Sequence, residues 1–187
     1  MQYENFELTP ISGALGAEIR GIDLSGELSN SAMEEINAAF QEYVVLLFRD
    51  QDLSLKEHRE FAARFGNLIP HPYVTGLEDD PDIFEIVREP GENFSWDNFY
   101  HSDLMFLEKP PMASALYAVT VPPYGADTEF CNMYLAYETL SDRMKEMIET
   151  LRGVNESGDP GHWSDKYESM HRLKNAATEA THPIVRV

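Results

Sequence analysis

The sequence predicts a mainly β fold, with an antiparallel core and helices packed outside it. Strand-like segments dominate the middle of the chain, whereas helical patterns lie early and late. The chain has 187 residues, of which 43% are hydrophobic and 11% aromatic, enough for one domain with a substantial core. We therefore expect residues 1–187 to belong to a single domain.

The strand predictions rest on short apolar runs bounded by turn or polar residues. Residues 14–24 (ALGAEIRGIDL) predict a strand that enters a turn. Residues 43–50 (YVVLLFRD) are rich in β-branched and aromatic side chains, which is typical of a buried strand. Three further segments have strand-like patterns: 83–89, 113–121 and 127–133. The sequence PPYGA between the last two is typical of a turn, and HPIVRV at the end of the chain begins another strand.

Two helices are predicted near the N-terminus from apolar periodicity and capping signals. Residues 29–43 carry apolar side chains at helical spacing, with a Ser-x-x-Glu capping box at 31–34. Residues 54–66 begin with a second capping box at 54–57 and end at a glycine.

The C-terminal third is predicted to be helical and then irregular. Residues 134–151 have a helical pattern with a break near Ser141. Residues 153–181 are polar, with Gly and Pro early and helix-forming residues late. This composition predicts a long surface loop that contains a short helix.

The charge and the cysteine content exclude several kinds of protein. A net charge of −19 repels phosphate backbones and anionic lipids, so we expect no nucleic-acid or membrane partner. A small anionic substrate remains compatible, because a local cluster can oppose the overall field. The single cysteine, Cys131, allows neither an intrachain disulfide nor a cysteine zinc cluster. The N-terminus lacks signal-peptide features and no long apolar run occurs, so we expect a cytoplasmic protein.

One pair of residues could carry chemistry: His101 and Asp103, in the segment 99–111 (FYHSDLMFLEKPP). On a regular strand, side chains two residues apart point the same way and could reach one metal ion. An imidazole and a carboxylate suit Fe(II), Mn or Zn, and two His with one carboxylate form the non-heme Fe(II) oxygenase arrangement. The same spacing also arises by chance at a solvated strand end, so the spacing alone leaves both interpretations open.

The wider context of this pair resembles a known family. Residues 101–130 (HSDLMFLEKPPMASALYAVTVPPYGADTEF) contain, in order, His-Ser-Asp, an apolar and aromatic pair, Pro-Pro, a strand and a Gly-x-Asp-Thr turn. This order resembles the taurine and aryloxyalkanoate dioxygenase family, which uses Fe(II) and 2-oxoglutarate. Residues 7–29, 43–68 and 136–155 resemble the same family, so the resemblance covers essentially the whole chain.

The resemblance implies a fold, a metal and a cosubstrate. The family fold is a double-stranded β-helix, a jelly roll of the clavaminate synthase type. His101 and Asp103 are implied to be catalytic metal ligands for Fe(II), with 2-oxoglutarate and O2 as cosubstrates. Thr128 matches the threonine that helps to hold the distal carboxylate of 2-oxoglutarate. Without the resemblance, Thr128 would be interpreted as a turn residue that satisfies its own backbone.

Substrate-binding residues are implied in two places. His71 matches a family histidine that contacts the anionic group of the substrate, although it could equally be a simple loop histidine. Tyr73 lies in the same loop and is a weaker candidate. Phe106 could line the substrate pocket or pack as an ordinary core aromatic.

The chain departs from the family pattern at its C-terminal end. In the family, a second histidine ligand and an arginine that pairs with 2-oxoglutarate lie further downstream. His182 and Arg186 lie in a segment that resembles an earlier part of the family, so neither residue is assigned these roles. We therefore expect the chain to stop before the last core strands of the domain and to be inactive by itself.

The resemblance implies a dioxygenase that hydroxylates a small organic acid and releases succinate and CO2. Its substrate would be an alkylsulfonate such as taurine, or an aryloxyalkanoate, and the protein could form a homo-oligomer. One alternative is a non-catalytic or truncated β-sandwich relative that acts as a binding module. A second is a zinc hydrolase with its metal at His101 and Asp103. Consumption of 2-oxoglutarate distinguishes the dioxygenase from both alternatives.

Overall fold

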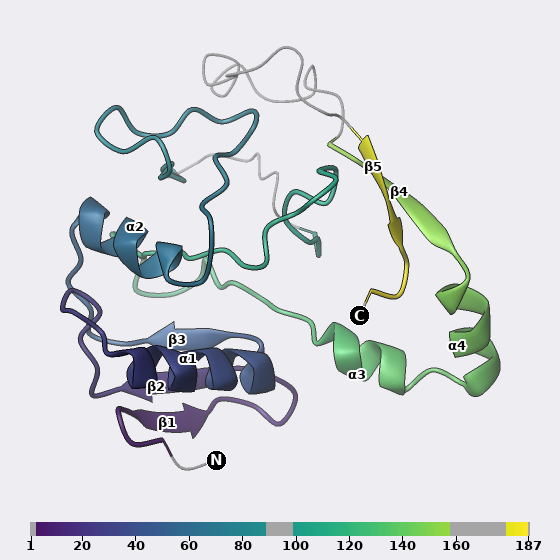
Figure 1. Cartoon of the computed structure of the whole chain (residues 1–187), viewed down its shortest axis with the longest axis horizontal. Helices are drawn as coiled ribbons and strands as arrows, with labels where there is room; N and C mark the ends of the chain where they lie inside the picture. Colours follow the sequence, from purple (N-terminus) through teal and green to yellow (C-terminus); the bar gives the residue numbers. More distant parts are fainter. Residues whose placement is uncertain (1–2, 89–98, 158–178, 187) are drawn as a thin grey trace. The chain divides into compact units, whose positions relative to one another are not determined.

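The computed structural model describes residues 3–88, 99–157 and 179–186 (Figure 1). The chain divides into two compact units. Unit 1 comprises Met1–Leu68 and Tyr117–Ala136, and unit 2 comprises Ile69–Leu116 and Tyr137–Val187. Within the described ranges, no helix is both long and apolar enough to cross a membrane.

Unit 1 contains a three-stranded sheet in the order β1-β2-β3, formed by β1 (Glu7–Pro10), β2 (Ala17–Arg20) and β3 (Leu46–Phe48). β1 pairs antiparallel with β2, whereas β2 pairs parallel with β3. A parallel pair needs a crossover connection, which the helix α1 (Asn30–Tyr43) supplies. The expectation of a purely antiparallel core is therefore wrong for this sheet, while the strand predicted within residues 14–24 is confirmed as β2.

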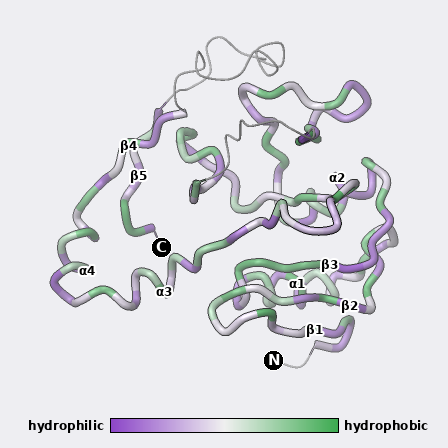
Figure 2. Tube along the Cα trace, turned by 180° about the vertical axis from the view of Figure 1, so that it is seen from behind, coloured by the Kyte–Doolittle hydropathy of each residue, from purple (hydrophilic) through white to green (hydrophobic). Residues whose placement is uncertain are grey.

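The core of unit 1 lies between this sheet and α1, which runs along the sheet in Figure 1. Ile19 of β2 and Ile36 of α1 are fully buried, and Met33 packs in the same cluster. Figure 2 shows apolar residues along β3, as the sequence predicted. β3 is nevertheless only half-buried, since Leu47 in its centre is 37% exposed.

The start of α1 differs from the prediction. Ser29 is the N-cap residue, because its backbone is extended and its hydroxyl accepts a hydrogen bond from the Ala32 amide at 3.1 Å. The capping box predicted at 31–34 is wrong, because Ser31 already lies inside the first turn of the helix. Only Ser31 has a Glu three residues later, so the sequence favours it, whereas the extended backbone at Ser29 identifies the actual N-cap.

The second capping box is confirmed at the start of α2 (Leu55–Ala63). The Ser54 hydroxyl accepts from the Glu57 amide at 3.3 Å, and the Ser54 amide donates to the Glu57 carboxylate at 2.7 Å. Two of the backbone amides that lack a partner within the helix, those of Ser54 and Glu57, are thus satisfied. The helix ends at Ala63, earlier than the predicted glycine stop.

The late helices agree with the sequence. α3 (Met133–Glu138) and α4 (Asp142–Glu149) are separated at the predicted break, where Ser141 caps α4 through a 3.4 Å bond from the Met144 amide to its hydroxyl. β4 (Arg152–Glu156) then pairs antiparallel with β5 (Glu179–Pro183) in unit 2.

The strand predicted at the end of the chain is confirmed only at residues 182–183, because β5 ends at Pro183 and residues 184–186 form no strand. β4 and β5 also correct the predicted loop over 153–181, because its first four residues belong to β4 and its last three to β5. The rest of that prediction falls mostly on 158–178, which lies outside the described residues.

Three predicted strands are wrong where the structure describes them: 83–88, 113–121 and 127–133 form no strand. Apolar side chains of the second segment are largely exposed, including Val119 at 85% and Leu116 at 75%. Local composition predicts that a segment can pair, but a strand forms only where a second strand is available. In the turn predicted between the last two segments the chain bends at residues 123–124, and Gly125 and Ala126 have positive φ angles of 78° and 56°.

Candidate metal site

The His101–Asp103 pair lies on a turn of unit 2 and not on a regular strand. Asp103 begins a turn in which Leu104 has a positive φ of 51° and the Leu107 amide donates to the Leu104 carbonyl at 2.9 Å. The strand geometry expected for the pair is therefore wrong. The two side chains nevertheless converge, since His101 Nε2 lies 3.3 Å from Asp103 Oδ1.

The Phe99 carbonyl determines which ring nitrogen of His101 carries the proton. Nδ1 lies 2.9 Å from the carbonyl oxygen of Phe99, which can only accept, so Nδ1 carries the proton. In the neutral ring, Nε2 then presents a lone pair towards the Asp103 carboxylate. A cation between His101 Nε2 and Asp103 Oδ1 would accept a lone pair from each atom. An imidazole and a carboxylate are ligand types that fit Fe(II).

A hydroxyl holds the other carboxylate oxygen of Asp103. Ser114 Oγ donates to Asp103 Oδ2 at 2.7 Å, which leaves Oδ1 directed towards His101. The sequence analysis missed Ser114, and no local signal marks it, because the contact spans eleven positions of the chain. Among the described residues, no group of three or more His, Cys, Asp or Glu could hold a metal ion, and His101 and Asp103 form a pair without a third such side chain.

His71 is a half-buried histidine in the same unit. Its Nδ1 accepts hydrogen bonds from the backbone amides of Tyr73 at 3.2 Å and Val74 at 3.0 Å, so Nε2 carries the proton. Burial lowers the pKa of His71, and the negative charge of Asp103 partly opposes this shift. The ring is therefore a neutral N–H donor near neutral pH, and it would contact an anion through a hydrogen bond and not through a full charge.

The three substrate-binding candidates lie together in unit 2. The ring of His71 is 6.1 Å from that of Tyr73, and Tyr73 is 5.4 Å from Phe106, centroid to centroid. Tyr73 is almost fully buried, and its hydroxyl bonds Ser157 Oγ at 3.2 Å, so it packs as a core residue. Phe84, which the sequence analysis did not single out, contacts His71 at 5.6 Å.

Thr128 lies in unit 1, whereas His101 and Asp103 lie in unit 2. It follows the turn formed by Gly125 and Ala126, in an exposed stretch with no helix or strand.

His182 is not available as a metal ligand through its ring Nε2. That atom lies 3.0 Å from the carbonyl oxygens of both Met105 and Leu107, and the residue is 8% exposed. The sequence analysis gave His182 no ligand role, in agreement with these contacts.

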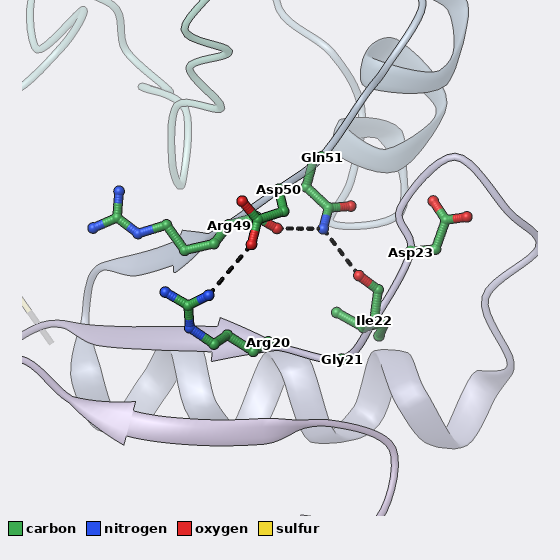
Figure 3. A pocket seen from close by; sticks show the side chains of 7 residues that line it. All are labelled: Arg20, Gly21, Ile22, Asp23, Arg49, Asp50 and Gln51. Carbon is green, nitrogen blue, oxygen red and sulfur yellow. Dashed lines mark hydrogen bonds and ion pairs between the residues drawn. The ribbon is translucent and has the colours of Figure 1, made fainter.

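A shallow pocket of unit 1 brings two arginines together at the ends of β2 and β3 (Figure 3). Arg20 and Arg49 share the carboxylate of Glu18, at 2.6 and 2.8 Å, and Arg20 also reaches Asp50 at 3.3 Å. The side-chain amide of Gln51 lines the same pocket and donates to the carbonyl of Ile22 at 2.9 Å. Because carboxylates already pair with these guanidinium groups, the pocket links two strands and offers no ready site for an anion.

Comparison with known proteins gives the family. The family model described as "Taurine catabolism dioxygenase TauD, TfdA family" matches residues 7–187. The chain is 34% identical to an alkylsulfatase of Acinetobacter baylyi, over 98% of the chain and 60% of that protein. It is 32% identical to an alpha-ketoglutarate-dependent sulfate ester dioxygenase of Pseudomonas putida, over 97% of the chain and 62% of that protein.

The solved structures agree with this result. A crystal structure of a taurine dioxygenase from Burkholderia xenovorans superimposes with a TM-score of 0.73 at 30% identity, over 98% of this chain and 59% of that one. The chain thus spans about three fifths of the length of these relatives. Since the family description matches nearly every residue and the fold agrees, the chain belongs to the taurine catabolism dioxygenase TauD/TfdA family.

Proposed function

We propose that the protein acts as an Fe(II)- and 2-oxoglutarate-dependent dioxygenase on a small organic anion. The observation that carries this proposal is the convergence of His101 Nε2 and Asp103 Oδ1 at 3.3 Å, with the remaining polar atom of each side chain already held by a neighbour. Family membership supports the reaction type, since relatives are named as alpha-ketoglutarate-dependent dioxygenases.

In this proposal His101 and Asp103 hold the iron through Nε2 and Oδ1. When bound, the iron supplies oxidation of the substrate by O2, coupled to conversion of 2-oxoglutarate into succinate and CO2. The Phe99 carbonyl fixes the imidazole tautomer, and the Ser114 hydroxyl fixes the carboxylate rotamer. Thr128 is proposed to bind the distal carboxylate of 2-oxoglutarate through its hydroxyl.

The substrate-binding side of the proposal involves His71, Tyr73 and Phe106. A neutral N–H donor backed by aromatic rings suits an anionic head group with an apolar body, such as a sulfate ester, a sulfonate or an aryloxyalkanoate. The names of the two relatives at 34% and 32% identity favour sulfate esters as the first class to test.

The composition supports two further parts of the proposal. The net charge of −19 disfavours nucleic acid and anionic lipid as partners. A single cysteine is compatible with a reducing cytoplasmic location. A homo-oligomer is proposed by analogy with the family alone.

A binding module that has lost turnover is the second candidate. It is favoured by one observation, namely that the described residues contribute two metal ligands at this site and no third. Such a protein would bind a divalent metal weakly and would release no succinate.

Succinate release separates these candidates. The protein expressed from the full reading frame that contains this chain is purified and incubated with Fe(II), 2-oxoglutarate, O2 and, separately, an alkyl sulfate, taurine or an aryloxyalkanoate. A dioxygenase releases succinate with at least one of them, and the variants His101→Ala and Asp103→Asn abolish it. Asp52→Asn, an exposed aspartate of unit 1, is the matched control and should leave succinate release unchanged.

The other outcomes identify the alternatives. Metal binding without succinate supports the binding module. Cleavage of the substrate without loss of 2-oxoglutarate supports a hydrolase and contradicts the dioxygenase.

A further inference from the structure

The turn that follows Asp103 has a conformation that its own sequence does not favour. Leu104 has a φ of 51°, in the left-handed region where a side chain with a Cβ atom meets steric conflict. The local bond from the Leu107 amide to the Leu104 carbonyl, at 2.9 Å, closes this turn. Because glycine is absent from the turn, contacts from other parts of unit 2 must stabilise it.

His182 of β5 provides such a contact. Its Nε2 lies 3.0 Å from the carbonyl oxygens of Met105 and Leu107. Both partners can only accept, so Nε2 carries a proton and donates to two backbone groups of the turn. The residue is 8% exposed, which places this bifurcated bond away from bulk water, where it is stronger.

β5 gives His182 a fixed position. The strand pairs antiparallel with β4, and His182 stands opposite Gly153 in this ladder. The amide of Ile184 donates to the carbonyl of Leu151 at 3.1 Å, which extends the pairing beyond the strand. The imidazole is therefore attached to a paired element and can hold the turn from outside.

A second contact to the turn is made through the aromatic ring of Phe106. Phe106 packs on the buried ring of Tyr73 with a centroid distance of 5.4 Å. The side chain at the middle of the turn is thereby packed, while the backbone carbonyls on either side of it accept from His182. These contacts restrict both the position and the rotation of the turn.

We propose that His182 is a positioning residue for the metal ligand Asp103. Leu104 is the first residue after Asp103, so its backbone torsions determine how the turn leaves the ligand. Without the ring donor, Leu104 can relax out of the left-handed region and carry Oδ1 away from His101 Nε2. This inference rests on the proposed function for the metal, and it adds a residue that acts only through the backbone of the turn.

Two substitutions test the donor directly. His182→Leu keeps the bulk and removes the N–H, whereas His182→Gln retains an N–H donor at a comparable reach. Thr181→Val is the control on the same strand, because its exposed side chain is altered while the ladder is kept. Amide hydrogen exchange at Leu107 reports the turn, and Co(II) titration of the full chain reports the metal site.

The proposal expects faster Leu107 exchange and a higher Co(II) dissociation constant in His182→Leu, because the turn that carries Asp103 loses its backbone contacts to the ring. His182→Gln should restore both quantities, and Thr181→Val should change neither. The unfolding midpoint is measured in parallel, since a purely structural role would lower the midpoint of His182→Leu without a selective effect on its Co(II) affinity.

Unchanged Co(II) affinity in His182→Leu, or failure of His182→Gln to restore it, would overturn the proposal. If the unsubstituted chain binds no Co(II), the proposed function fails instead. The Leu107 exchange rates then still decide whether His182 holds the turn.

Discussion

Ser114 Oγ lies 2.7 Å from Asp103 Oδ2, and this hydrogen bond leaves Oδ1 facing the His101 ring. The hydroxyl donates to a carboxylate, which makes the bond shorter and stronger than a bond between neutral groups. In the proposed metal site, the rotamer of the Asp103 carboxylate is therefore set before a metal binds. This preorganisation reduces the entropy that metal binding would otherwise cost.

Removal of this hydroxyl should weaken the metal site. Ser114→Ala is expected to lower the affinity for Mn(II) or Co(II) about tenfold, because Asp103 becomes free to rotate. Ser114→Thr keeps the donor and should retain most of the affinity. Thr120→Val, at an exposed position in unit 1, is the control for loss of a hydroxyl. Equal affinities for Ser114→Ala and the unsubstituted protein would show that the bond has no role at the site.

His71 should make stability depend on pH. Its pKa lies below the ordinary value of 6.5, chiefly because burial disfavours the charged ring. Above that value the ring is neutral in both the folded and unfolded states, so stability is fully present. As the pH falls below about 6.5, the unfolded state binds a proton more readily than the folded state, and stability is lost.

The measurement is urea unfolding at several pH values between about 8 and 5, the range in which histidines titrate. His71→Gln removes the titrating ring and keeps an acceptor for the two backbone amides. The variant should therefore lose less stability than the parent on acidification. An identical pH dependence in both proteins would contradict the assignment of His71 as a buried neutral histidine.

Gly76 should be sensitive to a single added carbon. A Cβ atom at this position would overlap the carbonyl oxygen of Pro81, so the backbone would have to move. Gly76→Ala is expected to destabilise the protein by about 1–3 kcal/mol, as overpacking usually does. Gly13→Ala is the control, because a Cβ there meets nothing within 4 Å. Thermal unfolding compares the two variants, and similar midpoints would contradict this close approach.

The N-cap of α1 is open to a direct test. Ser29→Ala should cost about 1 kcal/mol, because it removes the 3.1 Å bond to the Ala32 amide. Ser31→Ala should cost less, since Ser31 lies within the first turn. Denaturant unfolding of the two variants measures the difference, and the reverse order would restore the capping box predicted from the sequence.

Local signals accounted for the elements that the sequence predicted well. The reciprocal bonds of Ser54 and Glu57 and the helix break at Ser141 involve residues three positions apart, so composition and spacing suffice to recognise them. The alternation of buried and exposed residues in β2 is likewise a property of four consecutive residues.

The remaining features depend on contacts that local sequence does not encode. His182 reaches Met105 across 77 positions, and β4 pairs with β5 across a long intervening segment. Residues 113–121 have strand composition but lack a paired strand among the described residues. The same holds for the candidate site: the resemblance identified His101 and Asp103, whereas Ser114 is eleven positions from Asp103 and its contact is seen only in the folded chain.

Metal titration tests the central claim most directly. Co(II) is added to the purified chain and to the variants His101→Ala, Asp103→Asn and Asp52→Asn, and binding is followed by calorimetry. We predict one ion per chain, with loss of binding in the first two variants and no change in Asp52→Asn. Equal binding by all four proteins, or no binding by the unsubstituted chain, would contradict a metal site at His101 and Asp103.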